Sequence, residues 1–289
     1  MLKALHCFDA LPESAPETSE RARRLLVQGN CAFAKKNAAS PQSKHVMGAH
    51  PGSPRLSLGH SNGIAPLQTP FAAILGCADA RVPPELLFSK GSNELFVVRV
   101  AGNVLGQECL GSLHYAVSHF STTLKLIVVL AHANCGAVTE AVEVYLQPSK
   151  YLDIATDYSV RSIEEHILLA VRVAAISLES LYGATATKQP GSRAALLEVA
   201  IVLNAALSAY RLRQEFQNRF PDLGVVFGAY DLISGHVRLP LSLPGQLSEE
   251  EKGLFAPPED AAGFRQIALR ICKGQLVRSL MAPARYRAS

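Results

Sequence analysis

The sequence of 289 residues lacks tryptophan, has only three methionines and has no excess of one charge, since 28 basic residues stand against 24 acidic ones. A net charge of +4 is too small to indicate a nucleic-acid partner. No uninterrupted apolar run approaches the ~20 residues that a membrane-spanning helix needs, and the first residues lack the pattern of a secretory signal. With 48% hydrophobic residues, we therefore expect a globular protein of the cytoplasm or another intracellular compartment. It should be neither secreted nor bound to a membrane.

Cysteine is also too sparse for a disulfide-stabilised fold, because only six cysteines are scattered over the whole chain. Most cysteines in such a protein serve as small buried apolar residues. Cys77 and Cys135 differ from the others, since each lies in a polar segment that directly follows an apolar run.

Short apolar runs alternate with segments of helical spacing, which is the pattern of strands buried on both faces of a parallel sheet. Near the C-terminus two further runs flank a turn and predict a hairpin. The sequence therefore predicts an α/β fold with a mostly parallel sheet, an antiparallel edge strand and flanking helices. Predicted strands span 71–77, 95–100, 124–131, 223–230 and 235–239. Helices are predicted over 109–120, 137–146 and 192–216, and a further helix is predicted to open with a capping box at Ser162.

The predicted organisation is one domain with an extension at each end. Residues 1–66 form an N-terminal helical arm and an irregular loop, 67–240 form the α/β domain that carries the site, and 241–289 form a C-terminal basic extension. Within the arm, a helix over 19–36 should end near Gly29-Asn30, since glycine and asparagine commonly terminate helices.

The end of the chain is basic and contains no acidic residue from Gly263 onward. Its apolar positions have helical spacing, which predicts an amphipathic helix. Such a helix could pack on its own domain, on a second subunit or on an acidic protein partner.

Two polar clusters carry the candidate chemistry: Cys77-Ala-Asp79-Ala-Arg81 and His132-Ala-Asn-Cys135. Each begins where a predicted strand ends, and open α/β sheets bind ligands at the carboxyl ends of their strands. Two thiolates and one imidazole suit Zn²⁺, and the lack of a fitting fourth Cys or His indicates a position left for an exchangeable ligand.

Asp79 stands two residues from a predicted ligand, where its carboxylate could accept a hydrogen bond from a hydroxide on the metal. Arg81 is its natural partner, because a guanidinium pairs bidentately with a carboxylate and keeps it ionised. The same Asp79 could instead turn onto the metal and block it, or the pair could merely cap a turn.

Several segments match, in order and spacing, the motifs of one known family. They are Gln68-Thr-Pro70, Gly76-Cys-Ala-Asp-Ala-Arg-Val-Pro83, Phe96-Val-Val-Arg99, Ala101-Gly-Asn103, Ser112-Leu-His-Tyr-Ala-Val117 and His132-Ala-Asn-Cys-Gly-Ala137, with Gln28-Gly-Asn30, Asn204, Gly228-Ala-Tyr-Asp231 and Gly235 outside that block. On these residues the sequence resembles the β-class carbonic anhydrases over roughly residues 20–240.

The resemblance implies a zinc enzyme, a lyase that interconverts carbon dioxide and bicarbonate. It implies Cys77, His132 and Cys135 as the zinc ligands, with the Asp79–Arg81 dyad beside the open position. The mechanism expected is attack of zinc-bound hydroxide, oriented by Asp79, on the carbon of carbon dioxide.

The resemblance also implies a homodimer or a multiple of dimers, with the pocket at the subunit boundary. Gln68, Phe96 and Tyr115 should line that pocket, Gln68 as the amide that binds a bicarbonate oxygen and the two aromatic rings as its apolar wall. A tight apolar slot suits carbon dioxide, which is small, linear and apolar.

The sequence departs from the family at a few positions. Val100 replaces a common asparagine and His114 a common glutamate. Ile74 stands where bicarbonate-regulated members have tryptophan, so we expect no such effector site although Arg99 is present.

Two alternatives stay open. Carbon disulfide and carbonyl sulfide are also linear and apolar, so a hydrolase of either on the same scaffold is possible. A non-catalytic scaffold protein with structural zinc, working through its basic tail, is the other. The sequence leaves undecided the substrate preference, the oligomer size, whether the zinc site rests open or closed, and the roles of 38–66 and 244–289.

Overall fold

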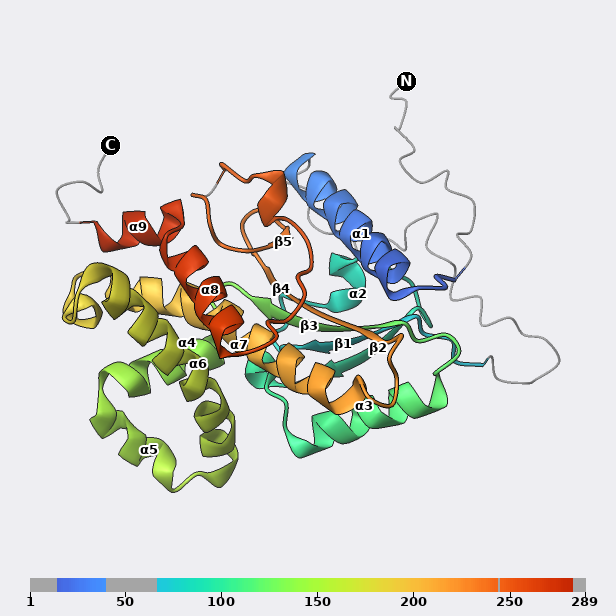
Figure 1. The fold of residues 1–289 in the computed structure, drawn as a ribbon, viewed down its shortest axis with the longest axis horizontal. Helices are drawn as coiled ribbons and strands as arrows, with labels where there is room; N and C mark the ends of the chain where they lie inside the picture. The colour runs from blue at the N-terminus through green and yellow to red at the C-terminus, as the bar shows by residue number, and fades with distance from the viewer. Residues whose placement is uncertain (1–14, 40–66, 244, 283–289) are drawn as a thin grey trace.

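The computed structural model describes residues 15–39, 67–243 and 245–282, which form helices around a sheet of five strands. Figure 1 shows their arrangement. The strand order is β2-β1-β3-β4-β5, with parallel pairs throughout except for the antiparallel pair of β4 and β5. This confirms the predicted fold class. The strands are β1 Ala72–Gly76, β2 Leu95–Arg99, β3 Leu126–His132, β4 Gly224–Tyr230 and β5 Val237–Arg238.

The register of the central strands aligns the two polar clusters. Gly76, the last residue of β1, pairs with Leu130 of β3, so the segments that follow both strands leave the same edge of the sheet. Every residue of β1 and β3 is buried, whereas β2 is an outer strand whose residues are partly exposed. The buried strands therefore fix the position of the site, as their apolar sequences predict.

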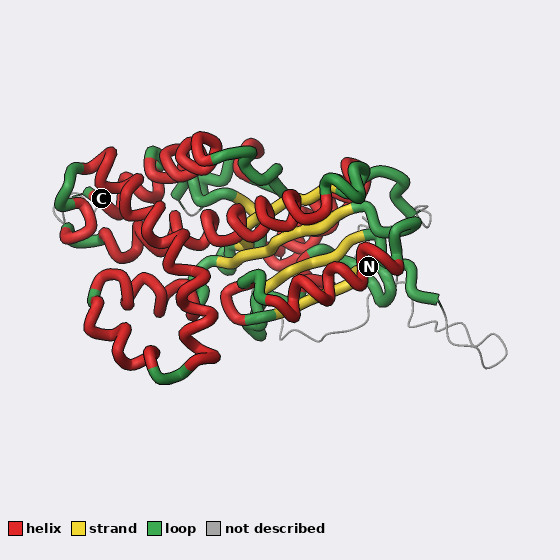
Figure 2. The backbone as a smooth tube through the Cα atoms, turned by 60° about the horizontal axis from the view of Figure 1, so that its bottom comes forward, coloured by secondary structure: helices red, strands yellow, loops and turns green. Residues whose placement is uncertain are grey.

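Helices cover the sheet on both faces (Figure 2). The longest two, α6 and α7, pack against each other, and α7 passes by length and composition as a membrane span although 78% of its most apolar stretch is buried inside the fold. The helices before the C-terminal extension are α1 Ser19–Ala39, α2 Pro84–Leu87, α3 Gln107–His119, α4 Gly136–Leu146, α5 Tyr151–Ala155, α6 Tyr158–Tyr182 and α7 Ser192–Phe216.

The start of α6 differs from the prediction. Its N-cap is Asp157, whose carboxylate accepts the backbone N–H of Val160. The predicted capping box at Ser162 is wrong, because an acceptor one turn earlier already satisfies the free N–H groups of the helix.

The N-terminal helix also differs, since α1 continues through Gly29 and Asn30 to its end at Ala39. A Cβ at Gly29 would lie 1.9 Å from the carbonyl oxygen of Phe88, so glycine serves close packing here rather than termination. The buried Asn30 side chain donates to the carbonyls of Leu87 (3.1 Å) and Gly235 (3.0 Å). The prediction that the helix ends near these residues was therefore wrong. The irregular loop predicted to follow falls on residues 40–66, outside the described part of the chain.

The C-terminal extension continues the sheet edge formed by β5. Isolated bridges join Phe227 to Phe255 and Arg238 to Lys252. Arg238 is buried between two carboxylates, with Nε 3.0 Å from Asp231 Oδ2 and Nη1 3.3 Å from Glu251 Oε2. These contacts fasten the extension to the domain.

The predicted amphipathic helix of the extension is two helices, α8 Ala261–Cys272 and α9 Gln275–Met281. They separate at Gly274, where a Cβ would lie 2.8 Å from the carbonyl oxygen of Leu241. The apolar side of α8 is buried against α6 and α7 of the same chain, and Arg265, Arg270 and Lys273 are exposed. Residues 283–289 lie outside the described part.

Candidate metal centre

The carboxyl edge of the sheet brings three of the predicted residues together. Cys77 follows β1, His132 ends β3, and Cys135 precedes the first residue of α4. All three side chains are buried, and their ligand atoms lie within 4.8 Å of one another. Within the described residues this is the group of three that could hold a metal ion.

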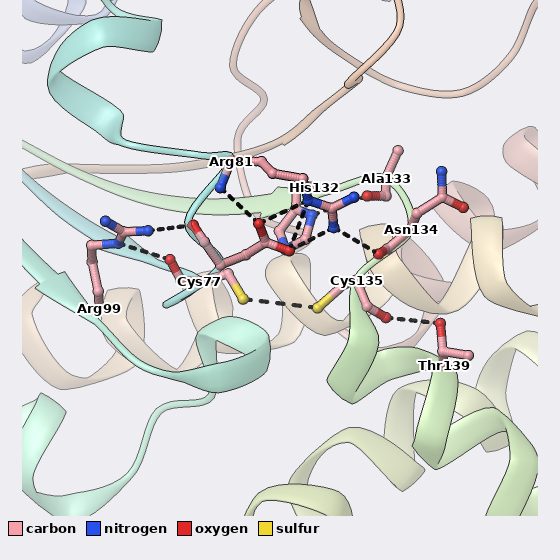
Figure 3. Close-up of polar contacts among 9 residues, drawn as sticks. Cys77, Arg81, Arg99, His132, Ala133, Asn134, Cys135 and Thr139 are labelled. Carbon is pink, nitrogen blue, oxygen red and sulfur yellow. Dashed lines mark hydrogen bonds and ion pairs between the residues drawn. The ribbon is translucent and has the colours of Figure 1, made fainter.

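The geometry of the three atoms fits zinc. The sulfurs of Cys77 and Cys135 are 3.9 Å apart, close to the ~3.8 Å expected of two sulfurs that share a tetrahedral zinc at ~2.3 Å. His132 Nε2 is buried without a hydrogen-bond partner in the described part of the chain. Its Nδ1 lies 2.9 Å from the carbonyl oxygen of Ala133, so Nδ1 donates and Nε2 keeps a free lone pair for a metal (Figure 3).

The two thiols influence each other strongly. The hydrogen bond with Cys135 is the largest cause that lowers the pKa of the Cys77 thiol to about 4, while burial opposes it. His132 and the backbone N–H groups of Asp79 and Gly102 lower the pKa of Cys77 further. The same hydrogen bond and burial raise the pKa of Cys135. One thiolate is therefore favoured without a metal, and a divalent cation would deprotonate the second thiol.

Asp79 and Arg81 form a close ion pair, and Asp79 lies beside His132. Arg81 Nη2 lies 2.6 Å from Asp79 Oδ2, and Arg81 Nε lies 2.9 Å from Asp79 Oδ1. These hydrogen bonds hold the pKa of Asp79 well below its usual range. Asp79 Oδ2 is 3.8 Å from His132 Nε2, so an ionised carboxylate faces the place where a metal would bind.

The three predicted pocket residues lie away from this centre. Phe96 pairs with Ala73, four residues before Cys77 on β1, which at ~3.3 Å per residue is about 13 Å along the strand. Tyr115 is 49% exposed and its ring lies 6.4 Å from that of Phe96. Gln68 is exposed and precedes β1. All three therefore lie toward the amino ends of the strands, whereas the metal centre lies at the carboxyl ends.

Arg99 has a role that the sequence did not reveal. The sequence offers it only as part of an effector site, whereas in the structure its guanidinium donates to the backbone carbonyls of Cys77 and Asp79. The available signal was its position as a charged residue at the carboxyl end of an otherwise apolar strand. His114, one of the departures from the family pattern, lies on α3 and pairs with Glu215 of α7 at 2.8 Å.

Comparisons with known proteins point to one family. A family model described as carbonic anhydrase matches residues 72–237. A 99-residue stretch is 43% identical to carbonic anhydrase 2 of Mycobacterium tuberculosis, covering 34% of this chain and 47% of that relative. A 73-residue stretch is 52% identical to a carbonic anhydrase of Mycolicibacterium smegmatis, covering 25% of this chain and 34% of the relative. The matched stretches thus span half or less of these curated relatives.

Among solved structures, the β-carbonic anhydrase CcaA superposes with a TM-score of 0.47 at 20% identity. The superposition covers 74% of this chain and 93% of that protein.

Proposed function

The chain belongs to the β-class carbonic anhydrase family, and from this premise we propose that it catalyses the reversible hydration of carbon dioxide to bicarbonate. The convergence of Cys77, His132 and Cys135 beside the Asp79–Arg81 ion pair carries the proposal. Bound by those three side chains, zinc would supply Lewis-acid activation of water as a nucleophile near neutral pH.

The residues around the centre each have a task in this proposal. Asp79 Oδ2 would accept a hydrogen bond from the nucleophile and so fix its orientation, which requires the carboxylate to stay ionised. Arg81 keeps it ionised through its side chain and holds it in place through its backbone N–H, 2.8 Å from Asp79 Oδ1. The second contact of Arg81, to the carbonyl oxygen of Asn134 at 3.3 Å, anchors the guanidinium to the segment between His132 and Cys135. These contacts would keep Asp79 from turning onto a bound metal.

We further propose that the substrate pocket is completed by a second copy of the chain. Gln68, Phe96 and Tyr115 are too far from their own metal centre to contact carbon dioxide there. A two-fold axis perpendicular to β2, placed at its outer side, would make the two β2 strands antiparallel, and would bring the amino-end residues of one copy beside the carboxyl-end residues of the other. The partly exposed β2 and the exposed ring of Tyr115 support this arrangement.

Stopped-flow hydration of carbon dioxide tests the proposed activity on the parent and on Cys135→Ser, with Cys31→Ser on α1 as the matched control. We expect hydration by the parent and the control, and loss of both zinc and activity in Cys135→Ser. Carbon disulfide and carbonyl sulfide are assayed on the same preparation. Turnover of either without carbon dioxide hydration would favour a hydrolase, and zinc with no turnover would favour a scaffold.

We propose an intracellular location, supported by the five described cysteines, which are all free thiols. We also propose a protein partner for the C-terminal extension, and the exposed basic residues of α8 support this proposal. Fractionation and co-purification test these two proposals.

A further inference from the structure

Arg99 contacts the segment that leads from β1 into the metal centre. It ends β2, and its Nε donates to the carbonyl oxygen of Cys77 at 2.9 Å. Its Nη2 donates to the carbonyl oxygen of Asp79. One guanidinium thus binds the backbone of Cys77, the first predicted ligand, and the backbone of Asp79 (Figure 3).

Backbone pairing keeps Arg99 beside the segment that follows β1. Pairing between the two chain segments continues beyond the strands, since Val100 N donates to Gly76 O at 3.0 Å and Ala78 N donates to Val100 O at 3.2 Å. In an extended segment, residues two apart present their side chains to one face. Cys77 and Asp79 therefore share a face, and holding both of their carbonyls fixes the directions of the thiol and the carboxylate together.

We propose that Arg99 is a positioning residue that holds Cys77 and Asp79 in the geometry required for zinc binding. This inference rests on the proposed function, because it concerns how the chain presents its zinc ligands. Arg99 acts differently from Arg81: Arg81 binds the Asp79 carboxylate, whereas Arg99 binds only the backbone of the segment. The planar guanidinium of arginine donates to two carbonyls in a fixed arrangement. A lysine at this position keeps the charge, but its flexible ammonium group does not keep this geometry.

Zinc release to a chromogenic chelator tests the proposal without any activity measurement. Purified zinc-loaded parent, Arg99→Ala and Arg99→Lys are compared, with Arg270→Ala on the exposed side of α8 as the control. We expect Arg99→Ala to release zinc about 10- to 100-fold faster than the parent, as for other groups that orient metal ligands. Arg99→Lys should fall between them, and the control should match the parent.

A spectroscopic measurement separates positioning from general stability. In the cobalt-substituted proteins, Arg99→Ala should shift the thiolate-to-cobalt charge-transfer band, while the metal-free forms of parent and variant should unfold at similar temperatures. If Arg99→Ala does not fold, Arg99→Lys decides the question by the same two readouts.

Parent-like zinc release and an unchanged cobalt spectrum in the folded Arg99 variants would overturn the inference and leave the proposed function intact. A parent that binds no zinc would overturn both, and that result is visible without any variant.

Discussion

The Asp79 carboxylate lies where its charge has the most effect on the proposed reaction. Its Oδ2 is 2.6 Å from Arg81 and 3.8 Å from His132 Nε2. Because the ion pair lowers the pKa of Asp79, the carboxylate is ionised throughout the neutral range. An amide in its place could still accept a hydrogen bond, but it would lose the charge and the bidentate partner.

Replacing Asp79 with asparagine should therefore lower carbon dioxide hydration by about 10²- to 10⁴-fold, the usual contribution of a residue that assists proton transfer. Zinc content should be unchanged, because all three ligands remain. Stopped-flow hydration and elemental analysis of one preparation measure both quantities. A variant as fast as the parent would show that Asp79 does not orient the nucleophile.

Glu164 is a second carboxyl group with an unusual environment, on α6. Its side chain is buried, and its Oε2 has no hydrogen-bond partner in the described residues. Burial, and then the charge of Glu140 on α4, raises the pKa of Glu164 to about 7. The folded protein thus binds a proton that the unfolded chain releases near its ordinary pKa of 4.5.

The stability of the fold should consequently fall as pH rises from about 4.5 to about 7, since the charged carboxylate is disfavoured only in the folded state. Glu164→Gln should stabilise the protein by about 2–3 kcal/mol at pH 8 and by little at pH 4.5. Urea unfolding at the two pH values measures the difference. Equal effects at both would mean that Glu164 is not buried as a neutral acid.

At the scale of elements, the strands were predictable and the helix ends were not. Runs such as 71–77 are buried on both faces, so composition alone indicates strands. From the sequence alone, a glycine such as Gly29 can either end a helix or permit close packing. The neighbouring Phe88 carbonyl, which only the structure shows, decides between these roles. Asp157 likewise caps α6 by geometry, although the motif at Ser162 has the better sequence pattern.

The contact of α1 with the end of α2 yields a prediction. Gly29→Ala would place a Cβ 1.9 Å from the Phe88 carbonyl oxygen, a backbone atom that moves only if a helix shifts. We expect a loss of about 1–3 kcal/mol of stability, as for other overpacked sites. Urea unfolding measures it, with the exposed neighbour Gln28→Ala as a control that should change stability by less than about 0.5 kcal/mol. A stable Gly29→Ala protein would contradict the packing of α1.

The metal site was more predictable than the pocket. Cys77, His132 and Cys135 follow strands that the sequence shows to be buried, so their meeting follows from strand adjacency. For Phe96 and Tyr115 the resemblance implies a place in the substrate pocket, but the sequence does not tell how far these residues lie from the metal centre. That depends on the distance between the two ends of the sheet, which only the fold supplies.

For the whole molecule, the two edges of the sheet differ. The β5 edge is covered by the C-terminal extension and fastened by the buried Arg238. The β2 edge is partly exposed and carries Phe96. Association through β2 alone would give a closed dimer, because the two-fold contact pairs the β2 edges of both copies and leaves neither free for a third copy.

Mixing two inactive variants tests whether the pocket is shared. The first variant, Asp79→Asn, disables the part of the pocket at the metal centre. The second, Tyr115→Ala combined with Gln68→Ala, disables the part of the pocket that binds the substrate from the opposite side. In a shared pocket, a mixed dimer contains one intact site, so unfolding and refolding an equal mixture should restore about a quarter of the parent activity. Activity no higher than that of the separate variants would place both sets of residues in the same site of one chain.

The central claim is that Cys77, Cys135 and His132 bind one zinc ion, and X-ray absorption at the zinc edge of the purified protein tests it most directly. The account predicts one zinc per chain with two sulfurs at about 2.3 Å, one imidazole nitrogen at about 2.0–2.1 Å and one further light atom. A protein without stoichiometric zinc, or a zinc shell without two sulfurs, would contradict it.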